Sequence, residues 1–101
     1  GQSLFLRVLD LDPLNAHAYD NLGSTLRPGE FVRLHDSTEW EKIALHAKAI
    51  ALDPSLANAH NNLAVALDEG ETMRMPDGSE VTRHDLFRRA AELDPTNAVA
   101  L

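Results

Sequence analysis

The chain has 101 residues, enough for one small domain with a modest core. Its 44% hydrophobic and 25% charged residues are typical of globular proteins, which argues against intrinsic disorder. A formal net charge of −7 disfavours nucleic acid and anionic membranes as partners, and the absence of cysteine excludes disulfides and thiolate chemistry.

The first predicted elements are two helices. Residues 4–12 carry apolar side chains at helical spacing and are predicted to be the end of a helix. A second helix is predicted over residues 13–26, with Asp12 as its N-cap and Pro13 in its first turn. Pro28 and the glycine after it end this helix. Its apolar face is predicted to hold Tyr19, Leu22, Gly23 and Leu26.

A hairpin and another helix are predicted next. Residues 31–37 suggest a short β-hairpin, although Ser37 stands where a turn favours glycine. Thr38 and Glu41 are candidates to cap the following helix, which runs to residue 52. Its inward side chains are predicted to be Leu45, Ala49 and Leu52.

The second half of the chain shows the same order of elements. A helix is predicted from Pro54, a hairpin around the turn Pro76-Asp77-Gly78, and a last helix that begins with a capping box of Thr82 and Asp85. When residues 1–60 are paired with residues 42–101, 21 of the 60 pairs are identical. We therefore interpret the chain as a fragment of a tandem array. Its predicted parts are residues 1–12 (the end of one unit), 13–53, 54–94, and 95–101 (the start of another).

The recurring pattern Leu-Asp-Pro-x-x-Ala-x-Ala-x-x-Asn-Leu-Gly/Ala-x-x-Leu resembles the tetratricopeptide repeat (TPR) family. The family period is 34 residues, so about seven residues are added here, and they fall at the predicted hairpins. Lys42 and Arg83 stand where the family has a small residue early in its second helix. The resemblance implies an all-α, TPR-like helical-repeat solenoid with short β-hairpin insertions between the helices of each repeat.

The same resemblance implies a protein–protein interaction scaffold, because first helices of the family line a concave groove that binds a peptide or a partner helix. The outward positions of these helices are His17, Asp20, Asn21, Ser24, Asn58, Asn61, Asn62 and Val65. Asn21 and Asn62 are equivalent, and an amide both donates and accepts hydrogen bonds, which suits the backbone of an extended peptide. The alternative is that these asparagines are solvated or bond to the neighbouring unit.

We expect no enzymatic activity, no cofactor and no metal site in this chain. The histidines lack the close pairing of helical metal sites, and His46 and His60 align with aromatic residues, so they are expected at helix-packing positions. The recurrence of Asp12, Asp53 and Asp94 indicates helix capping rather than acid–base chemistry.

Two aromatic residues and two arginines occupy the predicted hairpins. Phe31 and Trp40 are expected to pack on the chain's own helices, with a partner anchor as the alternative. Arg33 and Arg74 are candidates to pair with a nearby glutamate, Glu30 or Glu71, or with an acidic partner.

Other functions remain open at this stage. The chain is alternatively a structural spacer, a self-assembly segment that associates through uncapped repeat ends, or an interaction arm of a catalytic domain outside it. An RNA-binding helical repeat is disfavoured by the charge. A protein or peptide is the expected partner, without nucleic acid or membrane. The lack of cysteine and of a visible targeting signal favours the cytoplasm.

Overall fold

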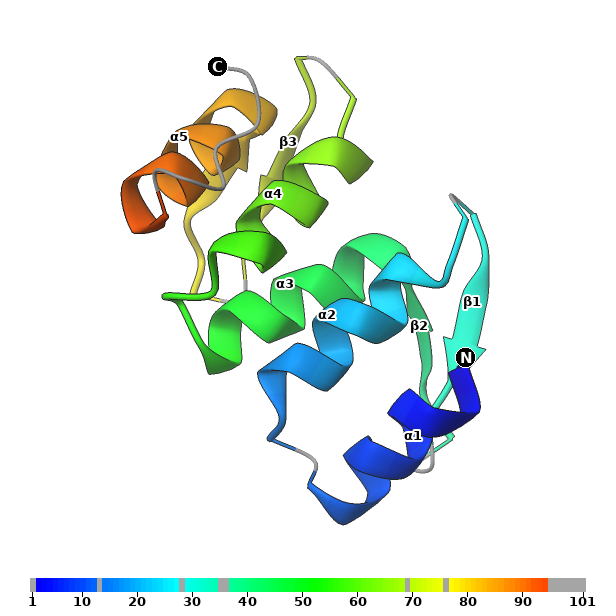
Figure 1. The fold of residues 1–101 in the computed structure, drawn as a ribbon. Helices are drawn as coiled ribbons and strands as arrows, with labels where there is room; N and C mark the ends of the chain where they lie inside the picture. Colours follow the sequence, from blue (N-terminus) through cyan, green and yellow to red (C-terminus); the bar gives the residue numbers. More distant parts are fainter. Residues whose placement is uncertain are drawn as a thin grey trace.

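The computed structural model describes residues 2–12, 14–27, 29–34, 37–68, 70–75 and 77–94, with side chains from residue 6 onward. Five helices and four short strands form in these residues (Figure 1). In chain order they are α1 (Gln2–Leu11), α2 (Ala16–Ser24), β1 (Phe31–Arg33), β2 (Glu39–Glu41), α3 (Lys42–Leu52), α4 (Ala57–Ala66), β3 (Thr72–Arg74), β4 (Glu80–Thr82) and α5 (Arg83–Leu93).

The helices pack as neighbours along the chain. α2 lies mainly against α3, α4 lies mainly against α5, and the contact between α3 and α4 joins the two pairs. α1 packs against α2 at the other end. The core between them combines fully buried leucines with alanines, whose small side chains let the helix backbones approach closely. Its most buried members are Leu22, Leu45, Ala49, Ala59, Leu63, Ala64 and Ala90.

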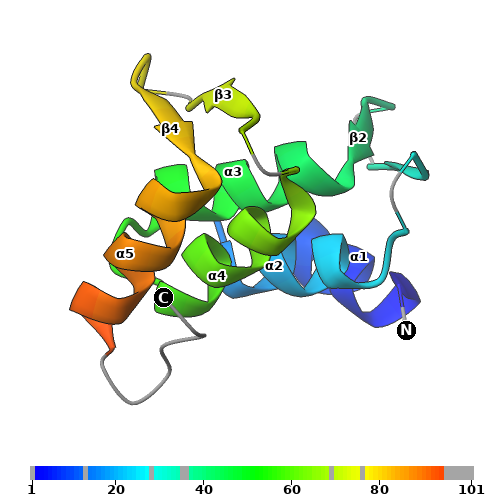
Figure 2. The ribbon, with the colours of Figure 1, turned by 90° about the horizontal axis from the view of Figure 1, so that it is seen from above.

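The strands form two separate antiparallel hairpins where the sequence predicts them. β1 pairs with β2, with Val32 opposite Trp40, and β3 pairs with β4, with Met73 opposite Val81. Both hairpins stand on the same side of the helices, with α3 beneath them (Figure 2). An isolated two-stranded hairpin is marginally stable, so each depends on the helices it touches.

The prediction of an all-α solenoid is wrong. The described residues form a small domain of mixed α/β class, with five helices and two small antiparallel sheets. The radius of gyration, 13.0 Å, is that of a compact chain of about 100 residues. Two helix pairs around one core do not extend into a superhelix, and the linking segments pair as strands. The interpretation as part of a tandem helical-repeat solenoid is therefore wrong too. Residues 95–101 lie outside the described residues.

The helix starts also differ from the prediction, because Asp12 and Asp53 cap turns instead of helices, while the residues after Asp94 lie outside the described part of the chain. Asn15 is the N-cap of α2, and its Oδ1 accepts from the amide of Ala18 at 3.0 Å. Asp12 and Asp53 lie in the preceding turns, and Asp53 Oδ1 accepts from the amide and the hydroxyl of Ser55 at 3.1 and 2.6 Å. These side chains satisfy nearby turn donors first, so the helices begin later.

The caps of α3 and α5 show one confirmed prediction and one error. Thr82 and Asp85 form the predicted capping box, with bonds of 3.2 and 3.0 Å. The equivalent residue before α3 is Glu41, which makes no side-chain cap bond. Thr38 cannot cap α3 because it lies before β2, where its hydroxyl accepts from Trp40 Nε1 at 2.6 Å.

The two hairpin turns are equivalent but differ in backbone strain. Ser37 has φ 70° and Gly78 has φ 91°. We predict that Ser37→Gly raises the free energy of unfolding by about 0.5 kcal/mol, because a left-handed residue with a side chain is strained. Gly78→Ala should lower it by about 1 kcal/mol for the same reason. Urea unfolding of both variants measures this, and a loss of stability in Ser37→Gly would contradict it.

Candidate functional site

The eight residues predicted to bind a peptide lie on α2 and α4, but they do not share one surface. The exposed ones are His17, Asn21, Ser24, Asn58 and Val65. Asn62 is half-buried, and Asp20 and Asn61 are buried inside the helix packing. Asp20 and Asn61 are therefore not presented at the surface, and the binding role of the exposed residues stays a prediction.

Asp20 is the centre of a buried polar network. Its side chain is almost fully enclosed, and Oδ1 accepts from His46 Nδ1 of α3 at 2.7 Å. The amide of Asn62, on α4, donates to both carboxylate oxygens at 3.1 and 3.2 Å. One carboxylate therefore ties α2 to α3 and α4. Asn62 therefore bonds to the preceding half of the chain, as in the alternative prediction of a bond to the neighbouring unit. The equivalent residue, Asn21, is exposed.

Two further residues surround this network. A Cβ on Gly23 would lie 2.9–3.1 Å from three ring atoms of His46, so only glycine leaves room for the imidazole. Lys42 Nζ donates to the carbonyls of Gly23 and Leu26 at 2.9 and 3.2 Å, which satisfies carbonyls at the end of α2. Burial lowers the pKa of Lys42, while the charge of Asp20 acts in the opposite direction. Lys42 thus has a structural task where the family has a small residue.

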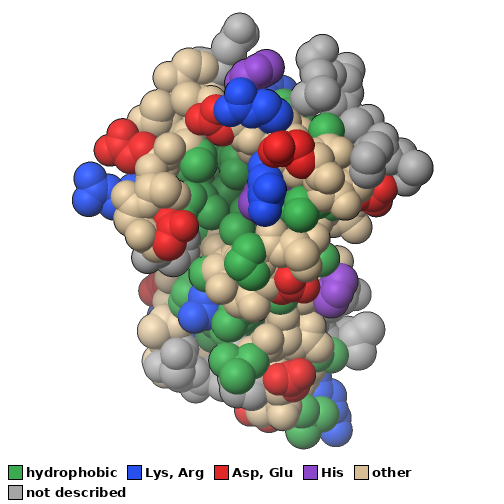
Figure 3. Space-filling view, turned by 90° about the vertical axis from the view of Figure 1, so that its left-hand side faces the viewer, with side chains coloured by type: hydrophobic (Ala, Val, Ile, Leu, Met, Phe, Trp, Pro, Cys, Tyr) green, Lys and Arg blue, Asp and Glu red, His purple; other side chains and the backbone are tan. Residues whose placement is uncertain are grey.

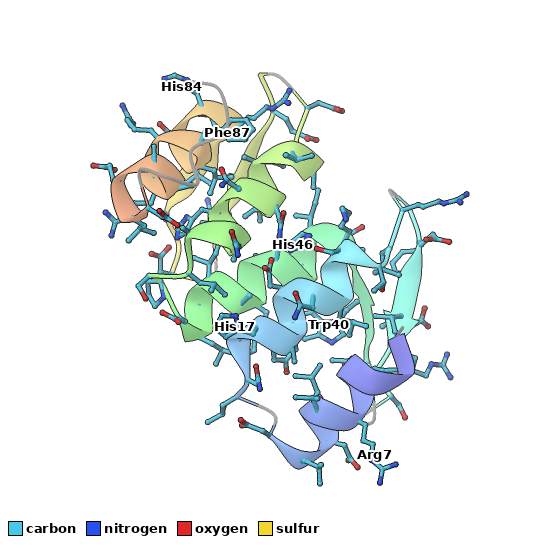
Figure 4. All side chains as sticks on the ribbon, viewed as in Figure 1. Arg7, His17, Trp40, His46, His84 and Phe87 are labelled. Atoms are coloured by element: carbon cyan, nitrogen blue, oxygen red, sulfur yellow. The ribbon has the colours of Figure 1, made fainter. Side chains whose placement is uncertain are left out.

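The two histidines predicted at helix-packing positions are confirmed there. His46 is fully buried and lies in the middle of the helices (Figure 4). His60 is also buried, and its Nε2 donates to the carbonyl of Pro54 at 3.0 Å. Its Nδ1 has no partner among the described residues. Burial lowers the pKa of His60, the bond to Pro54 raises it, and the charge of Arg89 lowers it further.

The lowered pKa of His60 predicts a pH dependence of stability. The folded protein binds the proton less readily than the unfolded chain, so the stability is complete above the ordinary pKa of 6.5 and is lost as the pH falls through the lowered value. In His60→Tyr, which places the residue found at position 19, the free energy of unfolding should fall less between about pH 7.5 and about pH 5. Urea unfolding at both pH values measures it. His84→Tyr, at an exposed position, should keep the wild-type dependence, and an unchanged dependence in His60→Tyr would contradict the assignment.

Among the described residues, a concave site lies on another face, between the two hairpins. We call it the hairpin groove, and its volume is about 580 Å³. Its floor is formed by Ile43, Ala44, Ala47 and Lys48 of α3. Its walls are formed by Trp40 and Glu41 of β2 and by Met73, Arg74 and Met75 of the second hairpin. Apart from three charged side chains, the lining is hydrophobic.

The aromatic residues of the first hairpin have different surroundings. The ring of Trp40 is half-buried, lies 6.0 Å from the ring of Tyr19, and also lines the hairpin groove. Phe31 is 61% exposed, so its predicted packing on the helices is wrong. Trp40 therefore has one side against the fold and one side in the groove.

Each hairpin arginine pairs with a glutamate on the other strand of the same hairpin. Arg33 lies 3.3 Å from Glu39, and Arg74 lies 3.6 Å from Glu80, with all four side chains exposed. Such pairs contribute little to stability. Glu30 and Glu71, the pairing candidates from the sequence, accept instead from backbone amides in the turns before the strands.

The groove is not predicted from the sequence above, although a comparison of the two halves of the chain contains a signal for it. Ala44 and Ala47 of α3 correspond to Asp85 and Arg88 of α5, so this face is apolar on one helix and charged on the other. Ile43 follows the same rule, since it corresponds to His84, whereas Lys48 corresponds to another cation, Arg89. An apolar face on a helix indicates a covered or binding surface.

A smaller hollow, about 310 Å³, lies between the end of α3 and the second hairpin. Ile50, Ala51, Pro54, Met75 and Asp77 line it. Figure 3 looks onto the α5 side of the molecule and shows hydrophobic side chains gathered among acidic and basic ones. The smaller hollow has about half the volume of the hairpin groove, so the hairpin groove is the stronger candidate.

Comparisons with known proteins give no match to any family model, curated protein or solved structure. The resemblance to the TPR family therefore stays a prediction. No described helix is both long and apolar enough to cross a membrane. Within the described part of the chain, no three His, Cys, Asp or Glu side chains come together as a metal site.

Proposed function

We propose that this chain is a protein-binding module that holds a short segment of another protein in the hairpin groove. The observation that carries the proposal is the groove itself, whose volume of about 580 Å³ lies in the range of about 300–1,000 Å³ typical of ligand sites. Its mainly apolar floor suits apolar side chains of a partner, and the floor is formed by one helix, α3.

The composition of the lining supports a protein partner. Met73 and Met75 have flexible, polarizable side chains that adapt to different apolar surfaces. Trp40 offers a large flat contact area of the kind that dominates binding energy at protein interfaces. Binding in this site involves no chemical step, and we propose neither a cofactor nor a nucleic acid for it.

The proposal differs from the sequence prediction in the surface that it uses. The exposed residues predicted to bind on α2 and α4 are mainly polar, and the side-chain amide of Asn62 already donates to Asp20. A variant such as Asn62→Ala would disturb the buried carboxylate, so a loss of binding in it would not identify a contact with a partner. Substitutions at exposed or groove positions avoid this problem.

The test uses a phage-displayed library of random peptides selected on the wild-type protein. Trp40 is the only tryptophan of the chain, so its fluorescence reports groove binding by enriched peptides that lack tryptophan. We predict that Ala44→Gln, which fills the floor without changing the charge, weakens these peptides at least about tenfold, the equivalent of 1.4 kcal/mol.

Val65→Gln is the matched control, because it places the same side chain on the exposed face of α4. It should leave affinity within about twofold, in line with the small effects of surface substitutions. Circular dichroism and urea unfolding confirm that both variants are folded. Enriched peptides that bind Ala44→Gln as well as the wild type, or that are lost in Val65→Gln, would place the site elsewhere.

A further inference from the structure

We propose that the segment held in the hairpin groove carries a carboxylate side chain beside its apolar residues, and that Lys48 selects this carboxylate with help from Arg74. This inference rests on the proposed function and names the chemistry of the partner. Lys48 and Arg74 come from different elements, α3 and β3.

Lys48 is the first observation. Its side chain is half-buried in the floor of the groove, and its ammonium has no hydrogen bond or ion pair among the residues that the structure describes. The ammonium of Lys42, by contrast, donates hydrogen bonds to two backbone carbonyls. A partly buried cation beside an apolar surface attracts an anion more strongly than a solvated one, because the effective dielectric constant is lower there.

Arg74 is the second observation, since it brings another cation to the same groove from the wall formed by the second hairpin. Its pair with Glu80 is long, 3.6 Å, and both side chains are largely exposed. Such a pair is weak, so the guanidinium can turn toward a bound carboxylate at little cost. Two cations therefore converge on the groove of a chain whose net charge is −7.

Glu41 makes the charge differ between the two ends of the groove. It lies seven residues before Lys48, which is about 10 Å along the axis of α3. A carboxylate of the partner is therefore attracted to the end with Lys48 and repelled from the end with Glu41. Complementary charge of this kind fixes the orientation and the choice of a partner more than its overall affinity.

The experiment repeats the peptide selection on three proteins. These are the wild type, Lys48→Glu, and Arg7→Glu as a control with the same change in net charge. Arg7 is exposed on α1, away from the groove (Figure 4). Synthetic versions of the enriched peptides, each with Glu, Gln or Lys at the charged position, are then titrated by Trp40 fluorescence.

We expect wild type and Arg7→Glu to enrich acidic peptides and to bind the Glu form about fivefold more tightly than the Gln form, as suits a partly exposed ion pair. In Lys48→Glu the order should reverse, with the Lys form bound most tightly. Sodium chloride at about 0.5 M should reduce the difference between forms in all three proteins.

The other outcomes separate this inference from the proposed function. Peptides that change Trp40 fluorescence but show no charge preference, or the same preference in Lys48→Glu, overturn the inference and leave the proposed function standing. No enrichment on any of the three proteins overturns both. Ultracentrifugation of the free protein completes the test, because self-association that Ala44→Gln abolishes would mean that a second copy occupies the groove.

Discussion

The arrangement of the central helices depends on the buried carboxylate of Asp20. A carboxylate removed from water is costly unless hydrogen bonds replace the lost hydration. Here the replacements come from His46 on α3 and Asn62 on α4. If either helix slid or rotated against α2, its hydrogen bond to Asp20 would break. The polar network therefore fixes an alignment that an alanine-rich core, with few large interlocking side chains, would specify less sharply.

This constraint also positions the candidate site. With 3.6 residues per helical turn, a residue two positions away points about 200° around the axis. His46 faces inward to Asp20, so Ala44 and Lys48 face outward, where they form part of the floor between the hairpins. The second half lacks this combination, since Phe87 replaces His46 and Asn61 replaces Asp20. α3 therefore contributes both to the buried polar network and to the floor of the hairpin groove.

The sequence predicted what local spacing determines and failed where distant segments meet. The capping box at Thr82 follows from residues within one turn, and the helix-packing positions of His46 and His60 follow from their alignment with aromatic residues in the other half of the chain. The fold class was wrong, because similarity between two halves does not say whether they extend or close around one core. The hairpin groove was missed because its parts, such as Trp40 and Met73, come from separate hairpins that only the packing of α3 and α4 brings together.

The central claim is that Asp20 and His46 act as a unit, and a double-mutant cycle measures this directly. Urea unfolding is measured for the wild type, Asp20→Asn, His46→Phe and the double variant. The double variant copies the residue pair found at positions 61 and 87. We predict that His46→Phe alone is strongly destabilising, because it leaves a buried charge underpaired. The double variant should then be more stable than the sum of the single effects predicts, by about 1–3 kcal/mol. Additive effects would show that the two side chains do not depend on each other and would contradict the account.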